Sequence, residues 1–337
     1  MSKPLMAAFA AAFLLAAMPA ASQPPAAATP QVEESLAFVA RLGEAVNVQV
    51  AGMKKLLDAK PLFESMTTPA RVKAAAPKVR ALMAEARRSV QQSDAMLAAI
   101  VPPPGLRLGS LSPASMIAEV RSQNAKSVAL LGDYDAFLVA AERGDRAAVL
   151  KAAPRLMEGS FLLVDGNATI YRNRQAAIPS DQSVHQALGI GVQLYRAESA
   201  AGRAWLAAKF GGRPDAAASS LGSQLAEVAR EARALSAEGR TNLARELSEL
   251  DRNTAGLGFQ GEEAATLARI RQALADKAKL FAIGDELAGL AEAGARVGGA
   301  ALAAQPSPQL LGQLAALELR FHGTLAEQAA MAAGKAP

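Results

Sequence analysis

The chain offers few residues whose chemistry could support catalysis or metal binding. Its only histidines, His185 and His322, each follow an acidic residue by four positions, Asp181 and Glu318. Residues four apart share a helix face, so each pair could supply part of a metal site. Di-iron helical bundles, however, need several glutamates with Glu-x-x-His spacing, which neither pair has. We therefore predict that each histidine is partly exposed and pairs with its carboxylate, and that no metal is bound.

Sequence signatures of nucleophilic and cofactor-dependent catalysis do not occur. Gly-x-Ser-x-Gly, Ser-x-x-Lys and His-Glu-x-x-His are all missing, and the chain has no cysteine. A glycine-rich phosphate loop would have to follow a strand, and no strand pattern is found. We predict neither a catalytic residue nor a cofactor. An enzyme with a carboxylate site stays an alternative, because paired carboxylates leave no local signature.

Three asparagines interrupt the apolar faces of expected helices. They are Asn47, Asn124 and Asn167, and Asn124 belongs to an unusually polar run, residues 121–126. Inward amides in a helical bundle could line a polar pocket for a small ligand. They could equally fix the register of the helices as buried, hydrogen-bonded groups, or they could face water. All three readings stay open at this point, and the pocket is the functional one.

The segment from Val46 to Leu57 resembles a known family. It is similar to the helix rich in amides and glycine of the periplasmic sensor bundles found at the front of pilus-linked chemotaxis transducers. The resemblance covers this one helix, and the chain lacks the Arg/Gln-rich continuation of that family. We therefore assign no family from it.

Basic residues concentrate on one expected helix, residues 69–100. Lys73, Arg80 and Arg87 recur every seven residues and so share a face, with Arg88 beside them. Such a stripe could bind an anionic partner, for example lipid head groups or a cell-wall polymer. The alternative is a solvated helix face, as charge runs on helices usually are. A nucleic acid partner is not expected, because no aromatic residues interleave with the charges.

The elements that would position these residues are helices. Half of the chain is apolar (51%) and only 4% is aromatic, so the core must consist of alanine, leucine and valine. Apolar residues recur at helical spacing, and no segment of useful length alternates with period two. Hydroxyl residues followed by proline predict helix starts; they occur at Thr29-Pro30, Thr68-Pro69, Ser112-Pro113 and Ser307-Pro308.

The pattern predicts an all-α protein with about eight helices. They are expected to form four antiparallel hairpins, near residues 30–100, 112–177, 181–252 and 262–333. A break near Ile178-Pro179 divides the chain into an N-terminal bundle, 23–178, and a C-terminal bundle, 179–337. A single continuous array of helices is the alternative.

The first residues have the features of an export signal. Lys3 precedes an apolar run from Leu5 to Ala17, and the small residues Ala20 and Ser22 end the segment. We expect cleavage after residue 22 and a periplasmic location. An uncleaved membrane anchor is the alternative, but the run is shorter than the roughly 20 residues a spanning helix needs. No later segment is expected to cross a membrane.

These observations favour a non-enzymatic, exported helical-bundle protein. It would bind an envelope protein or a small ligand in the cell envelope. A periplasmic chaperone or envelope-surface protein that uses the basic helix is the second hypothesis, and an enzyme with a carboxylate site is the third.

Overall fold

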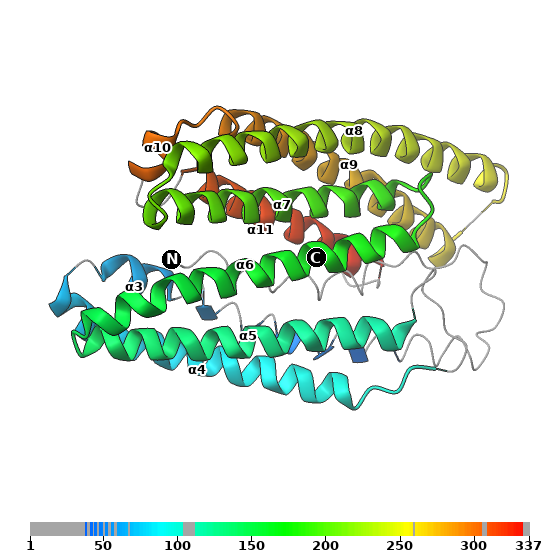
Figure 1. Cartoon of the computed structure of the whole chain (residues 1–337). Helices are drawn as coiled ribbons and strands as arrows, with labels where there is room; N and C mark the ends of the chain where they lie inside the picture. Colours follow the sequence, from blue (N-terminus) through cyan, green and yellow to red (C-terminus); the bar gives the residue numbers. More distant parts are fainter. Residues whose placement is uncertain are drawn as a thin grey trace. The chain divides into compact units, whose positions relative to one another are not determined.

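The structure is a computed structural model. It describes residues 60–66, 68–103, 112–258, 260–304 and 309–332, together with Phe38 and scattered positions from 41 to 59. Over these residues the chain forms helices that pack against one another, and no strand (Figure 1). The prediction of an all-α helical bundle is confirmed. The expected export signal, residues 1–22, and the proposed starts at Thr29 and Ser307 lie outside the described residues.

Nine helices have bounds within the described residues. In chain order they are α3 (Lys60–Ser65), α4 (Pro69–Ala98), α5 (Pro113–Glu142), α6 (Arg146–Ala177), α7 (Ser183–Phe210), α8 (Pro214–Thr254), α9 (Glu262–Gly294), α10 (Gly299–Ala304) and α11 (Gln309–Ala332). The described positions from 38 to 56 are also helical. Seven of the helices are long and correspond to the segments expected from the apolar periodicity, whereas α3 and α10 are short.

Two helix starts show the expected capping. The Thr68 hydroxyl accepts a hydrogen bond from the backbone N–H of Arg71, and the Ser112 hydroxyl accepts one from Ser115. In both cases proline is the first helical residue, where its missing N–H would have had no partner in the helix. The local sequence thus determines where α4 and α5 begin.

The contacts divide the chain into two compact units, which we describe separately. The described residues up to Asn167 belong to unit 1, and those from Ala168 onwards belong to unit 2. The division falls inside α6. The boundary expected near Pro179, between residues 23–178 and 179–337, stays a prediction.

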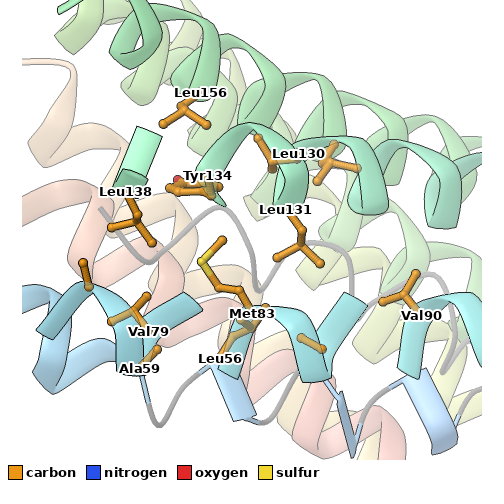
Figure 2. Close-up of a cluster of buried hydrophobic side chains, with 13 residues drawn as sticks. Leu56, Ala59, Val79, Met83, Val90, Leu130, Leu131, Tyr134, Leu138 and Leu156 are labelled. Carbon is orange, nitrogen blue, oxygen red and sulfur yellow. The ribbon is translucent and has the colours of Figure 1, made fainter. Parts of the chain in front are cut away.

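The core of unit 1 is built by four helical segments. Stretch 38–59, α4, α5 and α6 each contribute apolar side chains to one buried cluster (Figure 2). On α4 the buried residues follow one another at steps of three and four, the spacing of helices that pack almost parallel or antiparallel: Ala76, Val79, Met83, Ala86 and Val90. The side chains are mostly small or aliphatic, as the composition requires.

The core of unit 2 depends on close contacts between rings and glycines. Phe281 on α9 is fully buried, and its ring lies against the backbone at Gly239 of α8. The ring of Tyr171 lies in the same way against Gly191 of α7. At both glycines an added methyl group would overlap the ring. Because glycine has no side chain, these two positions leave room for the large rings between the helices.

Within the described part of the chain, no helix is both long and apolar enough to cross a membrane.

Candidate functional site

Buried polar side chains gather at one level of unit 1. They interrupt the apolar seams of the stretch before α3 and of α4, α5 and α6, and each is at most 3% exposed. We call them the amide layer: Gln49, Ser93, Gln123, Asn124, Ser127 and Asn167. Burying polar side chains among apolar ones lowers the stability of the fold unless they are hydrogen-bonded, so a buried layer of this kind points to a structural or a binding role.

Contacts between the first stretch and α4 show that two members lie at the same level. A methyl group at Gly52 would overlap the side chain of Ser89, which places these two residues opposite each other. The segments run antiparallel. Gln49, almost one turn before Gly52, is therefore level with Ser93, about one turn after Ser89.

The other members follow from contacts of α5 with its two neighbours. Arg121 of α5 pairs with Asp94 of α4, so the start of the polar run on α5 is level with Ser93. On the other side of α5, the Gln123 side chain lies on Gly166 of α6, where an added methyl group would overlap it. Because Gly166 precedes Asn167, all four segments contribute polar groups to one layer.

Several atoms of the amide layer lack a hydrogen-bond partner. Both amide atoms of Asn124 and both of Asn167 are buried without one within the described part of the chain. The Ser93 and Ser127 hydroxyls and the Gln123 oxygen are in the same state. Leaving a buried donor or acceptor unpaired costs about 1–3 kcal/mol each. The chemistry of the layer is therefore suited to a polar guest that both donates and accepts hydrogen bonds.

A groove of about 410 Å³ lies over this level of unit 1, between α4 and α5. Asn124 is the buried member of its lining, and Asp94 and Arg121 supply its charges. A second groove, about 460 Å³, lies between α9 and α11 in unit 2. Both grooves carry an arginine that bonds both oxygens of a carboxylate, Arg320 with Glu286 in the second and Arg121 with Asp94 in the first. Only the first groove has a lining residue, Asn124, with buried polar atoms that lack a partner among the described residues. We therefore take the groove over Asn124 as the candidate site.

The structure brings together two of the three predicted asparagines. Asn124 and Asn167 are buried in the amide layer. Asn47 is exposed, so it does not point into the bundle as the pocket interpretation required. The inward amide of that segment is Gln49, two residues further along. A shift of two residues turns a helix by about half a revolution, which moves a side chain from the core to the surface.

The basic stripe on α4 is only partly available. Arg80 bonds Asp135 of α5 at 2.6 Å and lies 3.7 Å from Glu142, so these two carboxylates neutralise its charge. Lys73, Arg87 and Arg88 are exposed. The positive charge of Arg88 acts on Glu85, where it helps to lower the pKa of that carboxyl, after the larger effect of Lys55.

The two histidines differ from each other. His185 does not pair with Asp181: its Nδ1–H donates to the carbonyl oxygen of Ile178 at 2.9 Å. Asp181 instead faces Arg245 of α8, with 3.5 Å between Oδ2 and Nη2. The predicted pairing of His185 with Asp181 is therefore wrong, whereas His185 is partly exposed, as expected. The sequence alone does not predict this ion pair, because Arg245 lies far from Asp181 along the chain.

His322 lies in a buried cluster of unit 2 that the sequence analysis missed. Its Nε2 is 3.6 Å from Glu318, as expected for the pair, but both residues are buried. The Tyr195 hydroxyl lies 2.7 Å from Nε2, and the Tyr171 hydroxyl lies 3.3 Å from Nδ1. The imidazole thus connects α6, α7 and α11.

Burial has the largest effect on the pKa values of the two tyrosines in this cluster. Loss of hydration raises the pKa of Tyr171 and of Tyr195 well above 10, and the negative charge of Glu318 raises both further. Neutral tyrosines are therefore stable here, and a phenolate would be strongly disfavoured. The cluster is enclosed by side chains, so we interpret it as a structural connection between helices.

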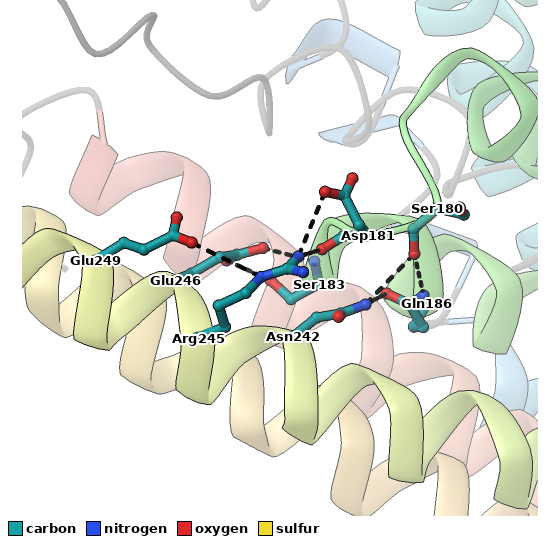
Figure 3. Close-up of polar contacts among 8 residues, drawn as sticks. All are labelled: Ser180, Asp181, Ser183, Gln186, Asn242, Arg245, Glu246 and Glu249. Atoms are coloured by element: carbon teal, nitrogen blue, oxygen red, sulfur yellow. Dashed lines mark hydrogen bonds and ion pairs between the residues drawn. The ribbon is translucent and has the colours of Figure 1, made fainter.

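A second polar network joins α7, α8 and α9 in unit 2. Figure 3 shows its contacts between α8 and the start of α7. Glu246 accepts hydrogen bonds of 2.6 Å from both the backbone N–H and the hydroxyl of Ser183, the first residue of α7. Lys277 donates to the same hydroxyl at 3.1 Å and to Glu246 at 3.3 Å. Serine beside lysine can form a nucleophile and its base. Here the serine is fully buried and its proton is held by a carboxylate, so the network caps the helix.

We expect Glu246→Ala to lower the free energy of unfolding of unit 2 by about 2–3 kcal/mol, because two charge-assisted hydrogen bonds disappear and a buried N–H loses its acceptor. The chain's single tryptophan, Trp205, lies in unit 2, so its fluorescence during urea unfolding is a suitable measurement. The control is Glu249→Ala, since Glu249 is 54% exposed and only 3.9 Å from Arg245. Equal effects of the two substitutions would contradict the capping role.

Weak sequence signals existed for the residues that the analysis missed. Gln49, Ser93 and Ser127 each continue a seam of buried residues at steps of three or four. A search for polar residues within such seams would have found them. The tyrosines around His322 gave no comparable signal, because their partners lie more than 100 residues away in the sequence.

Comparisons with known proteins give no relative: no family model, no curated protein and no solved structure matches the chain.

Proposed function

We propose that the protein is an exported, non-enzymatic helical-bundle protein that binds a small polar ligand in the cell envelope, at the amide layer of unit 1. The observation behind this is the pair Asn124 and Asn167, whose amide atoms are buried and have no hydrogen-bond partner among the residues that the structure describes. Helical bundles commonly hold ligands between their helices, and a groove opens beside Asn124. Export is supported by the signal pattern of residues 1–22.

Two features support a binding role over a catalytic one. The groups best suited to proton transfer, His322 with Glu318, are enclosed in unit 2. The serine with a neighbouring lysine, Ser183, is also enclosed. A general base must come within hydrogen-bond reach of the substrate. The groove, in contrast, offers an ion pair and amide groups, which recognise ligands without transforming them.

Asn124→Leu tests the proposal. The variant removes two unsatisfied buried atoms, so the free energy of unfolding of the ligand-free protein is expected to rise by about 1–3 kcal/mol. Ligand binding should be lost at the same time. We would compare the mature wild-type protein and the variant, both purified from the periplasm of the native host, by native mass spectrometry and by urea unfolding followed by circular dichroism.

Asn47→Leu is the matched control. Its amide is exposed, so the substitution should change neither the bound mass nor, beyond about 0.5 kcal/mol, the stability. A wild-type protein without bound ligand, combined with an Asn124→Leu variant that is less stable, would overturn the proposal. That result would favour a role of the asparagines in fixing the helix register.

The basic helix supports a second candidate, an envelope-surface or chaperone function. Lys73 and Arg87 are exposed on α4, two seven-residue repeats apart and so on one face of the helix, with Arg88 beside them. Reversing Lys73 and Arg87 to glutamate should then abolish sedimentation with vesicles of anionic lipid. Arg80 is left unchanged, because its partners Asp135 and Glu142 make it part of the fold. Unchanged sedimentation would exclude this use of the helix.

A further inference from the structure

The charged part of the groove in unit 1 is one ion pair. Arg121 of α5 bonds both oxygens of Asp94 on α4: Nε lies 3.1 Å from Oδ1, and Nη2 lies 3.2 Å from Oδ2. The side chains are 44% and 34% exposed. Both residues line the groove, together with the buried Asn124. A ligand in the groove must therefore meet a carboxylate and a guanidinium that now satisfy each other.

An ion pair of this kind can be separated at low cost. Exposed pairs contribute little to stability, because water and salt screen both charges. A ligand bound in the groove, however, displaces water from both groups. A ligand with a single charge would pair with either Asp94 or Arg121 and would leave the other with neither its partner nor its full hydration, a loss that binding would have to offset.

We propose that the ligand is a small zwitterion with a carboxylate and an ammonium group on the same or neighbouring carbons, as in free α-amino acids. This inference rests on the proposed function. The ligand carboxylate replaces Asp94 on the guanidinium of Arg121, which suits two parallel hydrogen bonds. The ligand ammonium forms an ion pair with the carboxylate of Asp94. Each protein charge exchanges one partner for another, and the net charge of the site is unchanged.

The rest of the lining agrees with a guest of this size and polarity. The groove, about 410 Å³, falls within the range of about 300–1,000 Å³ that is typical of small-molecule sites. Ala95 and Ala125 line it as well, and their small side chains leave room beside the ion pair. The buried amide of Asn124 has both a donor and an acceptor without a partner in the described part of unit 1, and these can complement either end of a zwitterion.

Binding of three matched ligand series tests the inference. Isothermal titration calorimetry would use the mature protein with free α-amino acids, with their N-acetyl derivatives and with their carboxamides. Acetylation removes the ammonium charge, and amidation removes the carboxylate. We expect binding by one or more of the free amino acids, and a loss of affinity of about tenfold or more when either group is blocked.

Protein variants test the same contacts from the other side. Asp94→Asn and Arg121→Gln should each weaken binding of the free amino acid by about tenfold or more. Glu85→Gln is the control. Glu85 of α4 also forms an ion pair with a neighbouring segment, through Lys55, but it does not line the groove. It should leave the affinity unchanged.

The possible failures are distinguishable. Equal binding of free and blocked amino acids, or no binding of any series, would overturn the inference. If native mass spectrometry then shows a bound molecule that is not a zwitterion and that Asn124→Leu removes, the inference fails and the proposed function stands. If the protein carries no ligand and Asn124→Leu lowers its stability, the proposed function fails as well.

Discussion

Phe281→Ala is expected to lower the free energy of unfolding of unit 2 by about 3–5 kcal/mol, the usual cost of removing a buried phenylalanine ring. Phe281 is fully buried on α9, and its ring occupies the space left by Gly239 on α8. The helices cannot close this space completely, because neighbouring side chains fix their separation. The loss should appear as an earlier transition in urea, followed by the fluorescence of Trp205.

The control for this substitution lies on the same helix. Ile270 of α9 is 46% exposed, so Ile270→Ala should change the stability by no more than about 0.5–1 kcal/mol. A comparable loss in both variants would mean that α8 and α9 do not pack around Phe281 as described. Circular dichroism of the folded variants would show whether the helix content is retained.

Alkaline pH is expected to unfold the protein through its tyrosines. All three tyrosines of the chain, Tyr134, Tyr171 and Tyr195, are buried, and burial raises the pKa of each above 10. In the unfolded chain they ionise near pH 10. Above that pH the unfolded state therefore binds fewer protons than the native state. Stability falls as the pH rises, by about 1.4 kcal/mol per pH unit for each tyrosine.

The two units should differ in this response. Unit 2 contains Tyr171 and Tyr195, so its stability should fall about twice as steeply above pH 10 as that of unit 1, which contains Tyr134 alone. The tyrosinate absorbance should appear only together with unfolding, as reported by circular dichroism and by Trp205. Below pH 10 the tyrosines are protonated in both the folded and the unfolded state, so their contribution to stability does not depend on pH there.

Phenylalanine variants identify the residues responsible. Tyr195→Phe and Tyr171→Phe should each remove about half of the alkaline slope of unit 2, although each also loses a hydrogen bond to His322 and so lowers the stability at neutral pH. Tyrosinate absorbance that develops at pH 10 in the folded protein would contradict the burial of these hydroxyls.

Sequence reasoning was most successful where the cause is local. Thr68 and Ser112 cap helices through bonds to residues three positions away, and proline follows each of them. These features can be read from four consecutive residues. The seven long helices were expected for the same reason, since the spacing of apolar residues reflects one face of one helix.

The candidate site was only partly predictable. Asn124 and Asn167 were found because they interrupt apolar faces, and they are buried. In the first stretch the sequence pattern points to Asn47, whereas the inward residue is Gln49. Which of two neighbouring polar residues faces the core depends on the rotation of the helix about its axis. That rotation is determined by packing against the other segments, and an Ala-rich sequence leaves several rotations of similar hydrophobicity.

The helical class, the starts of α4 and α5 and the periodic seams follow from the sequence alone, because these depend on backbone capping and on residues one turn apart. The tertiary structure alone decided that the amide layer lies at one level, that Asp135 neutralises Arg80, and that His322 contacts Tyr171 and Tyr195. These contacts join residues 55 to 151 positions apart. Their geometry depends on the relative register of whole helices, which the packing of all the side chains determines together.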